Sequence, residues 1–135
     1  MPTESSLPHV VAVNDEPTIL QVYAEILEEE GFRVTTQLVP FAEPADVVAL
    51  EPDLLVLDLM MGYLDWGTTF LGMLRADPRT SGLPIVVCTA VEVVEPLATQ
   101  LAAWHIAVVA KPFDIDVFTD AIRVGLAKRA ADPDA

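Results

Sequence analysis

The sequence is poor in basic residues and contains no long apolar run. Only 7 Lys and Arg stand against 21 Asp and Glu in 135 residues, which gives a formal net charge of −14. A chain with this charge repels the phosphates of nucleic acids, so we expect no nucleic-acid partner. A membrane-spanning helix needs about 18 consecutive apolar residues, and no apolar stretch of the sequence is that long. We therefore also expect no membrane partner.

The sequence also has a single cysteine and no basic leader. Cys88 lies inside an apolar stretch and has no second cysteine with which to form a disulfide within the chain. We interpret it as a small buried hydrophobic residue in a reducing compartment. The first seven residues lack the basic segment that begins a secretory signal. Together these features predict a cytoplasmic protein.

What the sequence does contain is enough apolar material for one packed domain, since 53% of its residues are hydrophobic. Apolar runs predict strands at about 10–13, 32–36, 53–57, 85–89 and 106–110. Helical spacing predicts helices at about 17–30, 43–50, 66–75 and 96–103, and a last helix through 118–126. Strands that alternate with helices predict a parallel sheet covered on both faces. We expect one domain over 9–129, with flexible tails at 1–8 and 130–135.

Polar residues follow four of the predicted strands, at the point where each strand ends. Asn14 and Asp15 follow the first strand, Asp58 follows the third, and Thr89 and Lys111 end the last two. Parallel strands place their carboxyl ends at one edge of the sheet, where open α/β sheets bind ligands. A carboxylate nucleophile, a second carboxylate for a metal, a hydroxyl and an ammonium would meet there. This combination suits phosphoryl transfer.

These strand ends resemble the landmark motifs of response-regulator receiver domains of the CheY-like type. The matching segments are Asn14-Asp15-Glu16-Pro17, Asp58-Leu59-Met60-Met61, Thr89-Ala90 and Lys111-Pro112-Phe113. The resemblance covers about 9–129. It implies a doubly wound, three-layer flavodoxin-like α/β fold with five βα units and the strand order 2-1-3-4-5.

The resemblance also implies the role of each site residue. Asp58 would be the phosphoacceptor and would form an acyl phosphate, with Lys111 as the fixed cation and Thr89 as the hydroxyl donor. The implied cofactor is Mg²⁺, bound by side-chain oxygens of Asp15 and Asp58 and by the backbone carbonyl of Met60.

The implied partners are proteins. A histidine kinase or a phosphotransfer protein would supply the phosphoryl group, and a downstream protein would bind the face formed by helix 4, strand 5 and helix 5. We expect a stand-alone signalling switch rather than a metabolic enzyme, at most catalysing its own phosphorylation and dephosphorylation. The helix after Thr89 carries more apolar residues than one core-facing stripe needs, which indicates a partner surface or a possible homodimer.

The sequence departs from the family pattern at several positions. Asn14 stands where most receivers have a first acidic residue, so it would bind the metal weakly or through water. Gly62 replaces a common Pro, and Trp66 stands where Gly is common, although we interpret Trp66 as a core residue. Val108 occupies the place of the usual Tyr or Phe of the switch. Trp104 replaces the Gly that commonly ends the fourth helix, which predicts a different helix end.

These departures leave alternatives open. A degenerate receiver could act as a phosphorylation-independent protein-binding module. A small flavodoxin-like enzyme or nucleotide binder is a third possibility, but neither G-x-x-x-x-G-K-[ST] nor G-x-G-x-x-G occurs in the sequence. We therefore predict a receiver that is phosphorylated on Asp58.

Overall fold

The computed structural model describes residues 7–59, 66–90, 92–111 and 114–131. Strands and helices alternate along these residues, as the apolar runs and helical spacings predict. The strands are β1 (His9–Val13), β2 (Arg33–Gln37), β3 (Leu54–Leu57), β4 (Ile85–Thr89) and β5 (Ala107–Ala110). The helices are α1 (Pro17–Glu29), α2 (Pro44–Val48), α3 (Trp66–Ala76), α4 (Leu97–Ala103) and α5 (Ile115–Ala131). The last helix thus reaches two residues beyond the domain end expected at 129.

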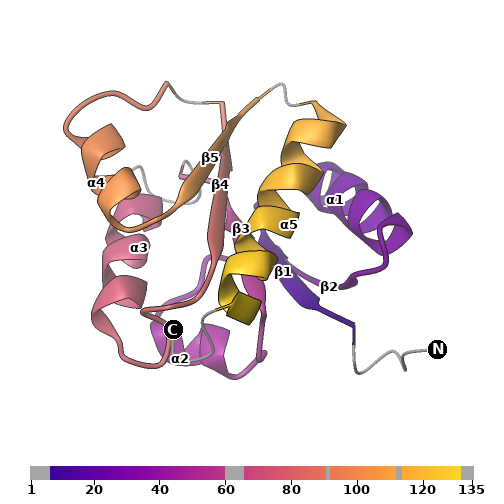
Figure 1. Cartoon of the computed structure of the whole chain (residues 1–135), viewed down its shortest axis with the longest axis horizontal. Coiled ribbons are helices and arrows are strands. Elements are labelled where there is room, and N and C mark those ends of the chain that lie inside the picture. Colours follow the sequence, from indigo (N-terminus) through magenta and orange to yellow (C-terminus); the bar gives the residue numbers. More distant parts are fainter. Residues whose placement is uncertain (1–6, 60–65, 91, 112–113, 132–135) are drawn as a thin grey trace.

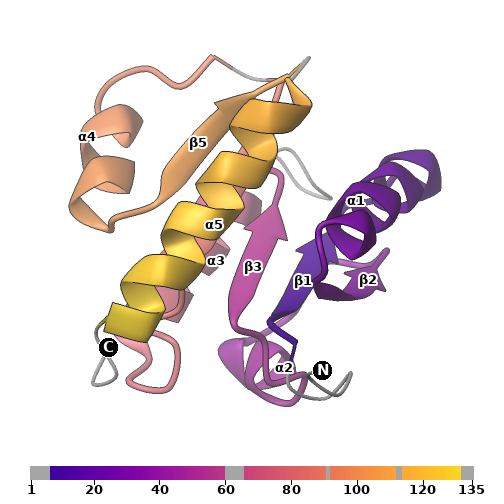
Figure 2. The same cartoon turned by 45° about the vertical axis from the view of Figure 1, so that its right-hand side comes forward.

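The strands form one parallel sheet in the order β2-β1-β3-β4-β5. Helices α1 and α5 cover one face of this sheet, and α2, α3 and α4 lie on the other (Figures 1 and 2). This confirms the predicted three-layer fold and its strand order.

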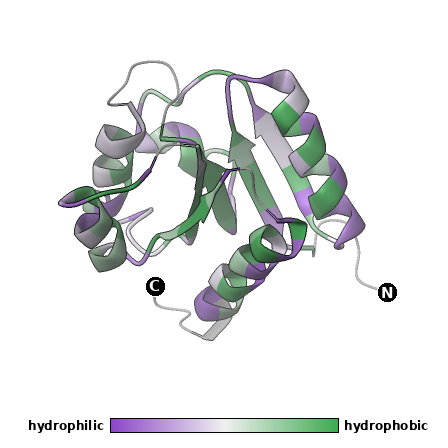
Figure 3. Ribbon diagram, turned by 90° about the horizontal axis from the view of Figure 1, so that it is seen from above, coloured by the Kyte–Doolittle hydropathy of each residue, from purple (hydrophilic) through white to green (hydrophobic). Residues whose placement is uncertain are grey.

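The core follows from the apolar strands, because β1, β3 and β4 are buried along their whole length. Figure 3 shows the hydrophobic colour concentrated on these central strands, while the helices carry both colours. On the face of α1 and α5, the rings of Tyr23 and Phe118 stack at 5.0 Å. On the opposite face, Phe70 stacks on Phe41 at 5.9 Å and on Trp66 at 5.2 Å. Both faces of the sheet are therefore closed by packed aromatic rings.

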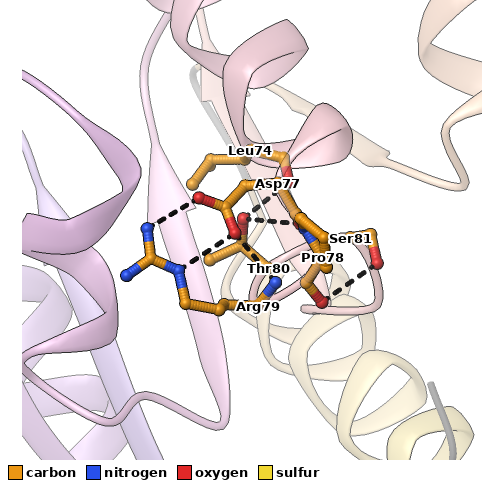
Figure 4. A network of polar contacts seen from close by, with 6 residues as sticks. All are labelled: Leu74, Asp77, Pro78, Arg79, Thr80 and Ser81. Atoms are coloured by element: carbon orange, nitrogen blue, oxygen red, sulfur yellow. Dashed lines mark hydrogen bonds and ion pairs between the residues drawn. The ribbon is translucent and has the colours of Figure 1, made fainter.

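The loop between α3 and β4 is held by its own polar groups (Figure 4). The Asp77 carboxylate accepts hydrogen bonds from the backbone N–H of Arg79 at 2.8 Å and from its guanidinium at 2.8 Å. The hydroxyl of Thr80 donates to the carbonyl of Leu74 at 2.6 Å. These bonds give the loop a fixed path from the end of α3 to the start of β4.

Helix α4 ends differently from the usual glycine stop, as the sequence predicts. Trp104 is the C-cap of α4. Its ring lies over Gly72 of α3, and an ideal Cβ built at Gly72 would be in ordinary contact with the ring, at 3.7 Å. The next residue, His105, takes the left-handed conformation with φ 57°. The left-handed conformation, which favours glycine, thus lies at His105, one residue beyond Trp104, where the family commonly has its glycine. Beyond it, β5 forms the edge of the sheet, and its residue Val108 is 42% exposed.

Candidate functional site

The register of the sheet brings the predicted site residues to one edge. Val13 lies opposite Leu57, so Asn14 and Asp58 leave the ends of neighbouring strands side by side. On the other side of β3, Thr89 ends β4 opposite Ala110, and the N–H of Lys111 donates to the Thr89 carbonyl at 2.9 Å. This edge is where a doubly wound sheet offers a crevice for ligands.

Asp58 and Lys111 form an ion pair in the site. The Lys111 Nζ donates to Asp58 Oδ2 at 2.7 Å, and the two side chains are 17% and 13% exposed. Partial burial reduces screening by water, so this ammonium orients the carboxylate more firmly than a surface lysine would. The pair joins the ends of β3 and β5, and neither of its side chains is fully buried.

The first strand contributes two residues with different surroundings. Asn14 is only 3% exposed, and its Oδ1 accepts a hydrogen bond from the N–H of Glu16 at 2.9 Å. This bond closes a local turn that leaves Asp15 exposed at the mouth of the site. The Asn14 amide oxygen is therefore already engaged by a backbone N–H, and Asp15 supplies the carboxylate of this pair.

The donor set fits a magnesium ion better than a transition metal. In the described segments, no group of three or more His, Cys, Asp or Glu residues is arranged to hold a metal. Mg²⁺ does not need such a group, because it keeps several waters and binds through one or two carboxylates together with phosphate oxygens. Asp15 and Asp58 can supply those carboxylates. Met60, whose backbone carbonyl the family resemblance adds to the set, lies outside the described residues.

The structure adds Tyr23 of α1 to the surroundings of the site. Tyr23 lies in the core on the face of the sheet that α1 and α5 cover. Thr89 is buried, and the residue before it, Cys88, lies beside the Tyr23 hydroxyl. Burial raises the pKa of the Tyr23 hydroxyl above its ordinary value, and the nearby Cys88 and Asp58 raise it further. Burial also raises the pKa of the Cys88 thiol. From the sequence, Tyr23 is one of several apolar positions on α1, so no signal marks its position beside β4.

The structure also identifies Gly67 as a residue that the site requires. An ideal Cβ at position 67 would lie 2.6 Å from the Cα of Leu59 and 2.8 Å from its carbonyl oxygen. Real Cβ atoms essentially never approach this closely, so only glycine allows α3 to pack on the segment that follows Asp58. The family commonly has glycine at the position of Trp66, and in this chain Gly67, one residue later, makes the close approach that needs glycine. Gly62 lies outside the described residues.

Trp66 itself is a packing residue, as the sequence predicts. Its indole N–H donates to the carbonyl of Phe41 at 2.9 Å, and its ring stacks on Phe70. These contacts join the start of α3 to the loop after β2. The start of α3 is therefore held by the Trp66 contacts on one side and by the close approach of Gly67 to Leu59 on the other.

The sequence matches the family described as response regulator receiver domain over residues 10–123. The chain belongs to the response-regulator receiver family. Receivers are the signalling domains of two-component systems rather than metabolic enzymes, and they generally bind Mg²⁺ where they are phosphorylated. Among the described residues, this receiver has no helix long and apolar enough to cross a membrane.

Several curated relatives are named as regulators of transcription. The receiver is 29% identical over 129 residues to the DNA-binding dual master transcriptional regulator RpaA of Synechocystis sp., an alignment that covers 96% of this chain and 53% of the relative. It is 33% identical over 107 residues to the probable transcriptional regulatory protein TcrX of Mycobacterium tuberculosis, covering 79% of this chain and 44% of the relative. The chain thus spans about half the length of the curated relatives that it matches.

Solved receivers share its fold. The chemotaxis response regulator CheY4 of Vibrio cholerae superposes with a TM-score of 0.75 at 21% identity, over 89% of this chain and 99% of that one. At this level of identity the likeness supports the fold alone.

Proposed function

We propose that this receiver accepts a phosphoryl group on Asp58 from a histidine kinase or a phosphotransfer protein, and that it signals through protein contacts. The observation that carries the proposal is the 2.7 Å ion pair between Asp58 and Lys111 at the carboxyl edge of the sheet. In a domain of this family, that pair places a nucleophile and a charge-stabilising group together at the ligand-binding edge.

Each residue then has a defined role in the transfer. An oxygen of Asp58 attacks the phosphorus of the donor phosphohistidine, and the P–N bond breaks with its electron pair passing to the histidine nitrogen. Lys111 releases the carboxylate and donates to the transferred oxygens, on which negative charge gathers. The Thr89 hydroxyl donates to the same group from the end of β4. When bound at Asp15 and Asp58, Mg²⁺ would supply further neutralisation of that charge.

We assign the output to the face formed by α4, β5 and α5. Val108 is exposed there and carries no aromatic ring, so the change that reports phosphorylation must use other groups on this face. The receiver carries a large negative charge, which supports a protein rather than a nucleic acid as the partner of this domain. Whether the domain works alone, as the sequence predicts, stays a prediction.

Intact-mass measurement after incubation with acetyl phosphate and Mg²⁺ tests the proposal. The wild-type protein should gain the mass of one phosphoryl group, and the Asp58→Asn variant should gain none. Asp120→Asn is the matched control, because Asp120 is an exposed carboxylate on α5, away from the site edge. A wild-type protein that gains no mass, even with a cognate kinase, would contradict the proposal and favour the phosphorylation-independent binding module.

A further inference from the structure

Position 108 carries no aromatic ring, although receivers commonly use a ring there to report the state of the acceptor. Val108 lies on the edge strand β5 and is 42% exposed. An aromatic side chain does lie close to the acceptor edge, but on the face of the sheet that α1 and α5 cover. This residue is Tyr23, which is 1% exposed and belongs to the core of that face. A buried tyrosine hydroxyl usually has a polar neighbour, and the neighbour of Tyr23 shows what the ring can sense.

Cys88 connects Tyr23 to the end of β4. Successive side chains of a strand point to opposite faces, and Cys88 belongs to the same core as Tyr23, whereas Val87 belongs to the core of the opposite face. The Cys88 thiol lies beside the Tyr23 hydroxyl. The next residue, Thr89, ends β4 and is 1% exposed. A shift of Thr89 therefore moves the backbone that carries the thiol next to the Tyr23 hydroxyl.

The charges of the acceptor pair also reach Tyr23 and Cys88. Burial raises the pKa of the Tyr23 hydroxyl most, Cys88 adds to this, and the Asp58 carboxylate raises it further. Burial likewise raises the pKa of the Cys88 thiol, on which Lys111 and Asp58 act with opposite signs. Water screens little between buried groups, so a change of charge at position 58 acts on both side chains.

The ring of Tyr23 continues the contact to α5. It stacks on Phe118 with 5.0 Å between the ring centroids and 20° between the ring planes. Phe118 is fully buried in the first turns of α5, and Figures 1 and 2 show α1 and α5 over the same face of the sheet. Packed cores leave little free space, so a displaced ring displaces its stacked neighbour.

Gly125 fixes a later part of α5 against the sheet. An ideal Cβ at Gly125 would lie 2.8 Å from Leu54 Cδ1 and 3.3 Å from the Cβ of Pro84. The helix therefore rests closely on the start of β3 and on the residue before β4. Phe118 lies about two turns nearer the start of the helix. A displacement of Phe118 would thus tilt the first turns of α5 about the contact at Gly125.

We propose that Tyr23 takes over the role of the missing ring at position 108 and couples the acceptor to α5, with Cys88 at one end of the link and Phe118 at the other. When the phosphoryl group draws Thr89 toward it, the end of β4 carries Cys88 along, and Tyr23 passes the movement to Phe118. Tyr23 takes no part in the transfer, so it is a positioning residue. The inference rests on the proposed function for the phosphoryl group that starts the movement.

Fluorine NMR of the full chain reads Tyr23 directly. The chain has two tyrosines, so incorporation of 3-fluorotyrosine gives two resonances, and Tyr63→Phe assigns the one from Tyr23. The Tyr23 resonance should move when acetyl phosphate and Mg²⁺ phosphorylate the protein, and Cys88→Ala should reduce this movement to about half or less. Val86→Ala is the control, because it truncates a side chain on the same face of β4 but further from the site, and it should keep the movement. An unmoved resonance in phosphorylated protein, or equal reductions in the two variants, would overturn the inference.

Hydrogen exchange measured by mass spectrometry reads the other end of the link. Phosphorylation should change the exchange of amides in 115–122 and leave 125–129 unchanged, because Gly125 fixes the later part of α5. Tyr23→Phe keeps the ring stack on Phe118 and removes only the hydroxyl. This variant should be phosphorylated to the wild-type extent but lose most of the change in 115–122. A full wild-type change in Tyr23→Phe would show that the hydroxyl serves the core alone and would overturn the inference.

A measurement without a phosphodonor separates this inference from the phosphoacceptor chemistry. Asp58→Asn removes the acceptor charge and should by itself move the Tyr23 resonance. An unmoved resonance in Asp58→Asn would overturn the inference whether or not the protein accepts a phosphoryl group. If the resonance moves but the wild-type protein gains no phosphoryl mass, the link stands and the proposed function fails. If mass is gained and the resonance stays in place, the inference fails and the proposed function stands.

Discussion

Gly67 and Leu59 approach so closely that no side chain fits between them, since an ideal Cβ at Gly67 would lie 2.6 Å from the Leu59 Cα. This contact fixes the start of α3 against the residue that follows Asp58. The start of α3 thereby supports, from behind, the strand end that carries the acceptor carboxylate. The geometry of the acceptor therefore depends on a residue that takes no part in the chemistry.

The first prediction compares two glycines of α3. Gly67→Ala should destabilise the fold by about 1–3 kcal/mol, because the new methyl group must displace backbone. Gly72→Ala should instead be neutral or stabilise by about 0.5–1 kcal/mol, since its Cβ would only contact the Trp104 ring at 3.7 Å. Urea denaturation measures both free energies of unfolding. Equal effects of the two substitutions would remove the special role of Gly67.

The second prediction concerns the metal-binding edge. Asn14→Asp keeps an oxygen that can accept the Glu16 N–H and adds a negative charge, so Mg²⁺ affinity should rise by about tenfold. Asp15→Asn should lower it by a similar factor. Titration with Mg²⁺, followed by isothermal calorimetry, gives both values. An Asn14→Asp variant with unchanged affinity would place the metal away from β1.

The third prediction tests Lys111 as the group that stabilises the transferred charge. Lys111→Met keeps a long side chain but removes the ammonium that contacts Asp58 at 2.7 Å. The rate of phosphorylation by acetyl phosphate should fall by about 100-fold, the usual cost of losing one such donor. Lys128→Met, at the opposite end of the sheet, serves as the control and should react at the wild-type rate. Equal rates for the two variants would contradict the role of Lys111.

The fourth prediction follows from the raised pKa values of Tyr23 and Cys88. The folded protein holds these two protons at pH values where the unfolded chain releases them, so their contribution to stability is complete below about pH 9. It is lost as the pH rises above about 9 for Cys88 and above about 10 for Tyr23, by about 1.4 kcal/mol per pH unit for each proton. Unfolding free energies between pH 7 and 11 should fall less steeply in Tyr23→Phe and Cys88→Ala. Identical slopes in all three proteins would refute the assignment.

The sequence predicts the framework of this protein because the framework depends on local patterns. Continuous apolar runs specify buried parallel strands, and the polar residue that ends each run marks the shared edge, so Asp58 and Lys111 could be brought together before any coordinates. The packing role of Trp66 and the burial of Cys88 were predicted for the same reason, since large or apolar residues within regular elements seldom find another place.

Other features depend on distances that no local pattern encodes. A family pattern counts residues from a landmark, and it places the missing glycines at Trp66 and Trp104. In the structure the close approach occurs at Gly67 and the left-handed conformation at His105, each one residue after the position that the family pattern gives.

The most direct test of the account reads the phosphorylated residue itself. Borohydride reduces an aspartyl phosphate to homoserine, so treatment of the acetyl-phosphate-labelled protein, followed by peptide sequencing by mass spectrometry, identifies the acceptor. We predict homoserine at position 58 in the wild-type protein and none in protein that was not phosphorylated. Homoserine at Asp15 or at another carboxylate instead, with position 58 unchanged, would contradict Asp58 as the phosphoacceptor.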